Sequence, residues 1–385
     1  MQLSVRAVAL LLGVTIAAPA SYTPASYNTT TPFSTFSQVT IFTPDENYTD
    51  PRVLYPRTVE LDNGVLLATW ENYSPEPPLV YFPIYRSADG GASWEEISRI
   101  QDTVNNYGLR YQPMLYRLPI AIGKFKAGTI LCAGNSIPTD LSVTKIDVYA
   151  SEDDGYNWNF VSHVAVGGRA VPDNGVPAIW EPFLLAYEGS IVLYYSDQRD
   201  TERYGQKLVH TVSEDLLTWG PDVEDVTYPV YTARPGMTTI IQLPNKQYMM
   251  TYEYGGGPTQ SSSYQFPVYY RINDSPLAFL DSVGLPIISK DGIQPTGSPT
   301  ITFSPTGGEN GTIIVSSGSN TQVFINRALG DSNAWETVET PEKAAYTRHV
   351  RVLESDPTHL LIMGAGVLPP STTNNVTVSV MEIPQ

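Results

Sequence analysis

Cysteine is almost absent from this 385-residue sequence, because Cys132 is the only one. No disulfide can form within the chain, so the fold must be held together by a packed core of its own. With 42% hydrophobic residues, the chain has the material for such a core. Cys132 stands in the apolar run 129–133, which favours a buried, inert side chain over a reactive thiol.

Basic residues are also few. Lys and Arg number 22 against 39 Asp and Glu, which gives a net charge of −17, and no basic tract occurs. A nucleic-acid partner or an anionic membrane surface is therefore disfavoured. After the N-terminal leader there is no run of 18 apolar residues, so we expect no membrane span.

Residue patterns of metal and nucleophile sites are missing. The four histidines lack His-Glu-x-x-His or His-x-His spacing, and there is no Gly-x-Ser-x-Gly elbow. We therefore expect no metal and no cofactor.

The N-terminus has the composition of an export signal. Arg6 precedes the apolar run 7–18, and Ala18-Pro19-Ala20 provides a small-residue cleavage site. Residues 1–20 are thus predicted to be a signal peptide, and the Ser/Thr/Pro-rich residues 21–35 a flexible leader. Glycosylation sequons fit a secreted, extracellular glycoprotein and begin at Asn28, Asn47, Asn72, Asn273, Asn310 and Asn375.

The rest of the chain shows β-strand patterns. Short β-branched and aromatic runs alternate with Gly, Asn, Asp and Pro turns, and no segment has a sustained helical period. This indicates an all-β sandwich, barrel or propeller.

A repeated turn motif decides among these. Residues 87–94 and 151–158 share the pattern Ser-x-Asp-x-Gly-x-(Ser/Asn)-Trp, an Asp-box, and a shortened copy spans 213–219. Decayed copies start at 271 and 326, so the five starts are 64, 62, 58 and 55 residues apart. In an Asp-box, Asp and Ser bind the turn backbone, Gly takes a positive φ and Trp packs beneath, so the motif is structural.

Around these turns we count six four-stranded units. The last unit is one strand short, and residues 38–42 can supply its outer strand. The predicted fold is a single six-bladed β-propeller over residues 36–385, closed by an N-terminal strand.

Blade geometry predicts where the site lies. The start of each first strand and the end of each second strand meet at one mouth of the central channel, opposite the Asp-boxes. The polar and aromatic residues at these positions are Arg57, Glu71, Asn72, Gln112, Asn135, Trp180, Glu181, Asp197, Arg199, Arg234, Glu253, Tyr254, Ser317, Tyr346 and Arg348.

Two glutamates among them suggest chemistry. Glu181 opens an apolar strand between Trp180 and Pro182, and Glu253 ends an aromatic strand before Tyr254 and three glycines. A pair of glutamates suits glycoside hydrolysis, in which one carboxyl protonates the leaving oxygen while the other, ionised, attacks the anomeric carbon. We expect the charge of an ionised Glu253 to raise the pKa of Glu181. Aromatic rings would hold the sugar.

Trp180-Glu181-Pro182-Phe183, Tyr252-Glu253-Tyr254, the Asp-boxes and the six-blade count resemble glycoside hydrolase family 93, the secreted fungal exo-1,5-α-L-arabinanases with a sialidase-like propeller. The resemblance spans residues 36–384. It implies a retaining enzyme, active as a monomer, that releases arabinobiose from linear arabinan, with Glu181 as acid/base and Glu253 as nucleophile. By blade position we add Tyr346 to the catalytic residues. The predicted substrate-binding residues are Arg57, Asn72, Asn135, Trp180, Asp197, Arg234, Tyr254 and Arg348.

Two alternatives stay open. A sialidase would need three arginines and a tyrosine nucleophile, which Arg57, Arg234, Arg348 and Tyr346 could imitate, although no aspartate clearly takes the acid role. A non-catalytic sugar-binding propeller would keep the aromatic residues without needing both glutamates.

Overall fold

The structure, a computed structural model, describes residues 34–259 and 263–385. The predicted signal peptide lies outside the described residues, as does the leader up to residue 33. Within the described ranges, no helix combines the length and the apolar character that a membrane crossing requires.

Six four-stranded antiparallel sheets make up the fold. Blade 1 contains β2 (Val53–Glu60), β3 (Leu66–Asn72), β4 (Phe82–Ser87) and β5 (Glu95–Ile100). Blade 2 contains β6 (Leu109–Arg117), β7 (Ile130–Ser136), β8 (Thr144–Ser151) and β9 (Asn159–Gly167). Blade 3 contains β10 (Ile179–Tyr187), β11 (Ser190–Asp197), β12 (Lys207–Ser213) and β13 (Val223–Val226).

Blade 4 contains β14 (Arg234–Gln242), β15 (Tyr248–Gly255), β16 (Val268–Asn273) and β17 (Leu285–Pro286), with the short 3-10 helix η1 (Phe279–Asp281) between its last two strands. Blade 5 contains β18 (Thr300–Ser304), β19 (Thr312–Ser316), β20 (Val323–Asn326) and β21 (Glu336–Val338). Blade 6 contains β22 (His349–Val352), β23 (His359–Gly364), β24 (Val376–Glu382) and β1 (Phe36–Phe42).

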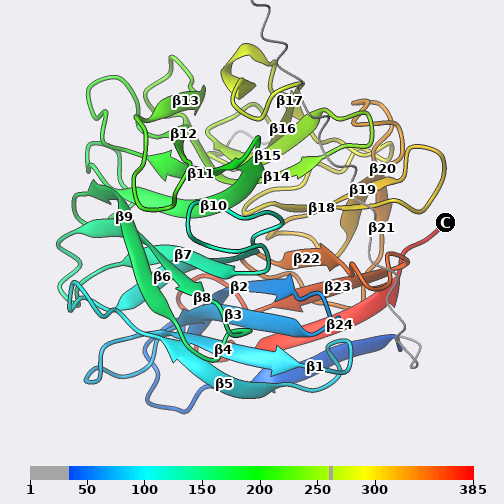
Figure 1. Cartoon of the computed structure of the whole chain (residues 1–385). Coiled ribbons are helices and arrows are strands. Elements are labelled where there is room, and N and C mark those ends of the chain that lie inside the picture. Colours follow the sequence, from blue (N-terminus) through cyan, green and yellow to red (C-terminus); the bar gives the residue numbers. More distant parts are fainter. Residues whose placement is uncertain (1–33, 260–262) are drawn as a thin grey trace, which may run out of the picture.

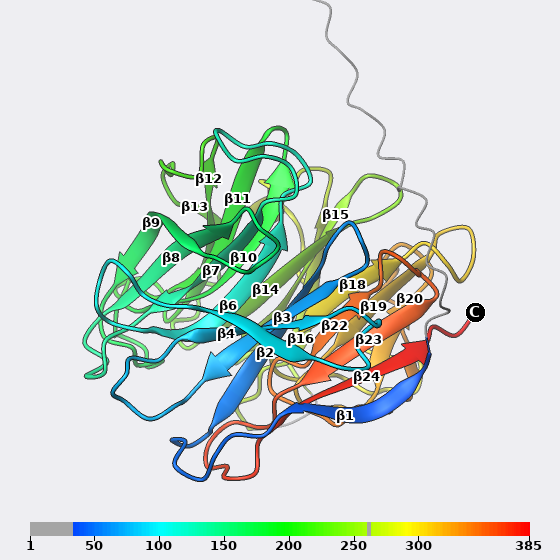
Figure 2. The same cartoon turned by 60° about the horizontal axis from the view of Figure 1, so that its bottom comes forward.

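The blades are arranged in a ring (Figure 1), and their first strands lie nearest the centre. Blade 6 has the order β22-β23-β24-β1, so the N-terminal strand supplies its outer edge. Figure 2 shows β1 in blue beside β24 in red. The predicted six-bladed propeller and its closure by an N-terminal strand are therefore confirmed.

Apolar side chains fill the spaces between blades rather than one central core. One cluster packs blade 1 against blade 2, and a second, which includes Trp70 and Leu361, packs blade 6 against blade 1. Corresponding clusters join the other four pairs of neighbouring blades. Each sheet is thus buried on both faces, and the ring is continuous.

The Asp-boxes form the turns that the sequence predicts. In the first box the Gly91 amide donates to Ser87 Oγ at 2.9 Å, and the Ser93 amide donates to Asp89 Oδ1 at 2.9 Å. Gly91 has a φ of +95°. The shortened third box has no glycine, and Leu216 takes the positive φ instead, at 65°. These bonds are local, which explains why the motif is visible in the sequence.

Candidate active site

The central channel has a cavity at each end. The cavity where the first strands begin has a volume of about 720 Å³. Its walls come from all six blades, and they include Leu54, Glu71, Tyr73, Tyr111, Gln112, Pro172, Trp180, Glu181, Gln206, Arg234, Glu253, Phe266, Ser298, Ser319, Tyr346 and Pro369. Five residues predicted for the site are therefore brought together here, namely Trp180, Glu181, Arg234, Glu253 and Tyr346.

Glu181 is held firmly at the start of β10. Its backbone has a φ of +65°, and the register with β11 shifts between Trp180 and Phe183, which marks a β-bulge. Its Oε2 atom accepts hydrogen bonds from Ser196 Oγ at 2.6 Å and from the Met237 amide at 2.7 Å. A non-glycine residue in the left-handed region is unusual, and such residues concentrate at functional sites.

Glu253 lies near the end of β15, in the next blade. Its Oε2 atom accepts a hydrogen bond from the Ser298 amide at 2.7 Å. Its partner across the β14–β15 pair is Gly236. The position of the missing Gly236 side chain is occupied by blade 3, because a Cβ atom there would stand 2.7 Å from Gln206 Nε2.

Glu181 also lies close to Gly236, since a Cβ atom there would stand 3.3 Å from Glu181 Oε2. Glu181 and Glu253 line the same cavity from neighbouring blades, and the charge of Glu181 contributes to the raised pKa of Glu253. A sugar bound in this cavity would therefore have both carboxyl groups in the wall around it.

A repeated backbone feature positions these carboxylates. One residue with positive φ occurs where each blade opens, in the series Tyr55, Gln112, Glu181, Met237, Ser298 and Thr347. Five of the six amides donate to a side chain of the preceding blade, and the acceptors are in order Glu71, Gln112, Glu181, Glu253 and Ser298. The bulges thus turn backbone amides toward the channel, where three of the five acceptors are glutamates.

Burial and mutual repulsion set the protonation of the pair. Burial raises the pKa of Glu253 to about 8, and the charge of Glu181 contributes to this rise. Burial also raises the pKa of Glu181, but the hydrogen bonds from Ser196 and Met237 oppose the rise. Both carboxyl groups therefore have a raised pKa with burial as the largest cause, whereas the sequence-based expectation named the charge of Glu253 as the cause for Glu181.

Three further residues of the cavity carry polar groups or aromatic rings. Arg234 donates to Gln206 Oε1 at 2.8 Å and to Gln198 Oε1 at 3.1 Å, and Trp180 Nε1 donates to the same Gln198 oxygen. Burial and the charges of both glutamates raise the pKa of Tyr346 well above its usual value, so its hydroxyl keeps its proton. The wall thus offers a cation, an indole and a phenol.

Several residues predicted to bind substrate do not line this cavity. Asn72 follows Glu71 on an extended strand, so the two side chains lie on opposite faces, and Asn72 is 3% exposed. Asn135 is fully buried and donates to Gln112 Oε1, whereas Asp197 forms an ion pair with Arg199. The structure thus places these three side chains outside the cavity, because a residue at a strand end need not point into the channel.

Tyr254 and Arg348 also lie elsewhere. The Tyr254 ring stacks on Tyr228 with centroids 3.8 Å apart and an interplanar angle of 8°. The fully buried Arg348 donates to the carbonyl oxygens of Thr321, Gln322 and Glu342. Its guanidinium stabilises loops of blades 5 and 6 rather than a ligand.

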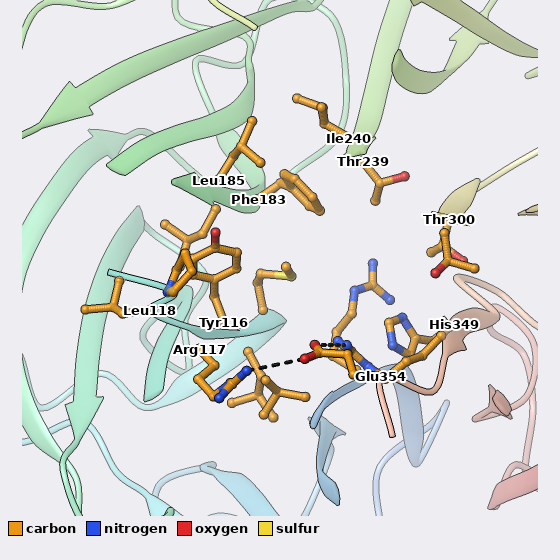
Figure 3. A pocket seen from close by; sticks show the side chains of 18 of the residues that line it. Tyr116, Arg117, Leu118, Phe183, Leu185, Thr239, Ile240, Thr300, His349 and Glu354 are labelled. Atoms are coloured by element: carbon orange, nitrogen blue, oxygen red, sulfur yellow. Dashed lines mark hydrogen bonds and ion pairs between the residues drawn. The ribbon is translucent and has the colours of Figure 1, made fainter. Parts of the chain in front are cut away.

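Arg57 belongs to the cavity at the opposite end of the channel, where the first strands end. This second cavity, of about 630 Å³, also contains His349 and Glu354, and Figure 3 shows the ion pair between Arg117 and Glu354 at its edge. The Arg57 guanidinium lies 4.1 Å from the centre of the Tyr55 ring, and Tyr55 in turn contacts Tyr346. Tyr55 therefore lies between Arg57 and the cavity where the first strands begin. Of the three arginines considered for a sialidase, only Arg234 lines that cavity.

Some residues of the cavity were absent from the predicted catalytic and binding sets. Glu71 and Gln112 stood only in the wider group of strand-end residues, and Tyr73, Tyr111, Phe266 and the 367–369 loop were not anticipated. Tyr73 follows Glu71 two positions later, a spacing that could have indicated a shared face. Within the described part of the chain, no group of three His, Cys, Asp or Glu side chains is arranged as metal ligands.

Two solved structures of fungal enzymes are similar to this chain over most of its length. One is the GH93 α-L-arabinofuranosidase of Fusarium graminearum in complex with arabinobiose. Its sequence is 54% identical to this chain, the TM-score is 0.89, and the match covers 90% of this chain and 98% of that one. An α-L-arabinanase of Penicillium chrysogenum, also with arabinobiose, is 56% identical with a TM-score of 0.88, over 91% and 98%.

The NanB sialidase of Streptococcus pneumoniae is 12% identical with a TM-score of 0.58, over 92% of this chain and 72% of that one, and therefore shares the fold alone. No protein-family model and no curated protein sequence matches the chain. The identity to the two fungal enzymes spans nearly the whole described propeller. The chain therefore belongs to glycoside hydrolase family 93.

Proposed function

We propose that this protein is a secreted, retaining exo-1,5-α-L-arabinanase that releases arabinobiose from linear arabinan. The observation that carries the proposal is that Glu181 and Glu253, from neighbouring blades, line one cavity. The two fungal relatives bound to arabinobiose support the identity of the product.

Glu253 acts as the nucleophile and Glu181 as the acid/base. In the first step a carboxylate oxygen of Glu253 forms a bond to the anomeric carbon while the glycosidic C–O bond breaks, and Glu181 gives its proton to the leaving oxygen. In the second step Glu181 takes a proton from water, the water oxygen bonds to the anomeric carbon, and Glu253 leaves. Each step inverts the centre, so the overall result is retention.

This division of roles requires the pair to hold one proton, on Glu181, when substrate is bound. Burial raises the pKa of both groups and the charge of Glu181 adds to the rise at Glu253, so the two groups compete for that proton. The positive charge that develops at the anomeric carbon stabilises an ionised Glu253, and the glycosidic oxygen gives the proton of Glu181 an acceptor. The pair therefore works with a single shared proton.

The other residues of the cavity hold the sugar. The apolar face of a furanose can pack against Trp180 or Phe266, while the guanidinium of Arg234 donates to ring hydroxyls. The protonated hydroxyl of Tyr346 is the donor that we assign to the neighbourhood of the nucleophile.

Export of the enzyme is part of the proposal and rests on the leader sequence, which lies outside the described residues. Among the sequons, Asn47 and Asn310 are exposed and so remain accessible after folding. Asn72 is 3% exposed, so we do not expect it to carry a glycan.

The test is to incubate the protein separately with linear 1,5-α-arabinan and with a sialoside and to identify the first product by chromatography. Arabinobiose from arabinan, with an intact sialoside, supports the proposal. Release of sialic acid would favour the sialidase alternative. Binding of arabinan without any product would favour a non-catalytic propeller.

A further inference from the structure

A third glutamate lines the catalytic cavity and has no role in the double displacement. Glu71 stands near the end of β3 and is 3% exposed. Within the described residues it forms no ion pair with a lysine or arginine; burial raises its pKa to about 7, and the charge of Arg57 offsets only part of this rise. Burial of a carboxyl group is costly, so its presence in a ligand cavity calls for an explanation.

Two neutral donors hold the Glu71 carboxyl group in place. The Tyr73 hydroxyl donates to Oε2 at 2.7 Å, and the Gln112 amide donates to Oε1 at 2.8 Å. A carboxylate has about four acceptor positions, so two remain for a ligand. Gln112 also links this group to the catalytic pair, because its Oε1 accepts the Glu181 amide at 2.9 Å. Glu71 therefore lies one hydrogen-bonded residue away from Glu181.

The wall around Glu71 is aromatic and firmly anchored. The rings of Tyr73 and Tyr111 contact each other with centroids 5.9 Å apart. The 367–369 loop lines the same cavity, and its continuation is tied to the segment before β2, since the Ser371 amide donates to Asp50 Oδ1 and Arg52 donates to the Thr372 carbonyl. This end of the cavity thus combines an acceptor, stacking faces and a fixed boundary, which are the elements of a sugar subsite.

We propose that Glu71, oriented by Tyr73, is a specificity residue that binds the free 5-hydroxyl of the terminal arabinose at the non-reducing end of the chain. This inference rests on the proposed function. In a 1,5-linked arabinan every residue has free 2- and 3-hydroxyls, but only the non-reducing terminal residue has a free 5-hydroxyl. A buried carboxyl group that accepts a hydrogen bond from this hydroxyl favours the terminal sugar. With an internal sugar, the carboxyl group would have no hydroxyl to bond.

The test is a cycle of two substrates and two enzymes. The substrates are an aryl 1,5-α-L-arabinobioside and its analogue that lacks the 5-hydroxyl on the terminal sugar. For the wild-type enzyme we expect kcat/KM to fall about 10²-fold on deoxygenation. For Glu71→Ala we expect the same deoxygenation to change kcat/KM by less than about threefold, since the partner of the hydroxyl is gone.

Tyr73→Phe keeps Glu71 and the ring packing, and it should give an intermediate deoxygenation factor. Tyr111→Phe is the matched control, because the Tyr111 hydroxyl lies in the same wall but does not bond Glu71. This variant should keep the wild-type deoxygenation factor. An equal deoxygenation factor in wild type and Glu71→Ala would overturn the inference, as would coupling of Glu71 to the 2- or 3-hydroxyl instead. If the wild-type enzyme fails to cleave the parent arabinobioside, the proposed function itself fails.

Discussion

Gly236 lies directly opposite Glu253 in the β14–β15 pair, and Glu181 of the preceding blade approaches it so closely that a Cβ atom there would stand 3.3 Å from Glu181 Oε2. A glycine at this position therefore lets Glu181 and Gln206 pack against the backbone of blade 4. The backbone of Gly236 does not have a positive φ, so the requirement for glycine comes from this close approach and not from the main chain.

Gly236→Ala should lower kcat/KM on arabinan by about 10²-fold, because a misplaced catalytic group costs rate steeply. The new Cβ atom would stand 2.7 Å from Gln206 Nε2 and 3.3 Å from Glu181 Oε2, so both side chains must move. The matched control is Gly220→Ala, whose Cβ atom would meet only the Val212 carbonyl at 3.5 Å. Steady-state kinetics on both variants test this prediction. Equal kcat/KM values for Gly236→Ala and Gly220→Ala would show that the site does not require a glycine at position 236.

The two catalytic glutamates should give different phenotypes. Glu253→Ala should lose activity on all substrates, and added azide should restore cleavage of an aryl arabinobioside with formation of the β-glycosyl azide. Glu181→Ala should lose on the order of 10²-fold or more on arabinan but much less on a nitrophenyl substrate, whose leaving group needs no proton. With this variant azide should give the α-glycosyl azide. Exchanged azide products would reverse the two roles.

The pH dependence of kcat/KM should be bell-shaped, because the pair works with one proton. Below the lower pKa of the pair both carboxyls are protonated and no nucleophile remains, whereas above the upper pKa both are ionised and no acid remains. Since burial raises the pKa of Glu253 to about 8 and that of Glu181 above 4.5, the acid limb should fall above pH 4.5 and the alkaline limb near pH 8. Rates measured from pH 3 to 10 check this, and an alkaline limb near pH 5 would contradict it.

Ring closure by β1 makes a prediction about folding. Val39, Ile41 and Phe42 pack on the cluster between blades 6 and 1, and the Gln38 amide donates to Ser379 Oγ at 2.8 Å. Deletion of residues 21–45 should therefore abolish a cooperative thermal transition, while deletion of residues 21–33 should leave the melting temperature nearly unchanged. Equal melting temperatures for the two truncations would refute this role of β1.

The sequence predicted the fold well because its signals are local. The Asp-box at residues 87–94 needs only hydrogen bonds among its own residues, and its repetition counts the blades. Alternation of side chains along each strand then identifies the mouth of the channel. Trp180, Glu181 and Glu253 could be found in this way because each stands at a strand end beside aromatic residues.

The rest of the site depends on contacts between blades. The bulges at Glu181 and Met237 change which side chains face the channel, and nothing in the local sequence announces them. Asn72 ends the same strand as Glu71, but its side chain lies on the other face. The pKa of Glu181 also depends on its burial and on donors such as the Met237 amide, which belongs to another blade, and neither can be read from the local sequence.

The most direct test of the double displacement is the configuration of the first product. A proton NMR time course on a fresh digest of linear arabinan resolves the anomers of the released arabinobiose before they equilibrate. Direct attack by Glu253, followed by attack of water on the same carbon, predicts that the α-anomer appears first. Initial appearance of the β-anomer would contradict the account, because it would mean that water attacks the sugar directly and that no covalent intermediate forms on Glu253.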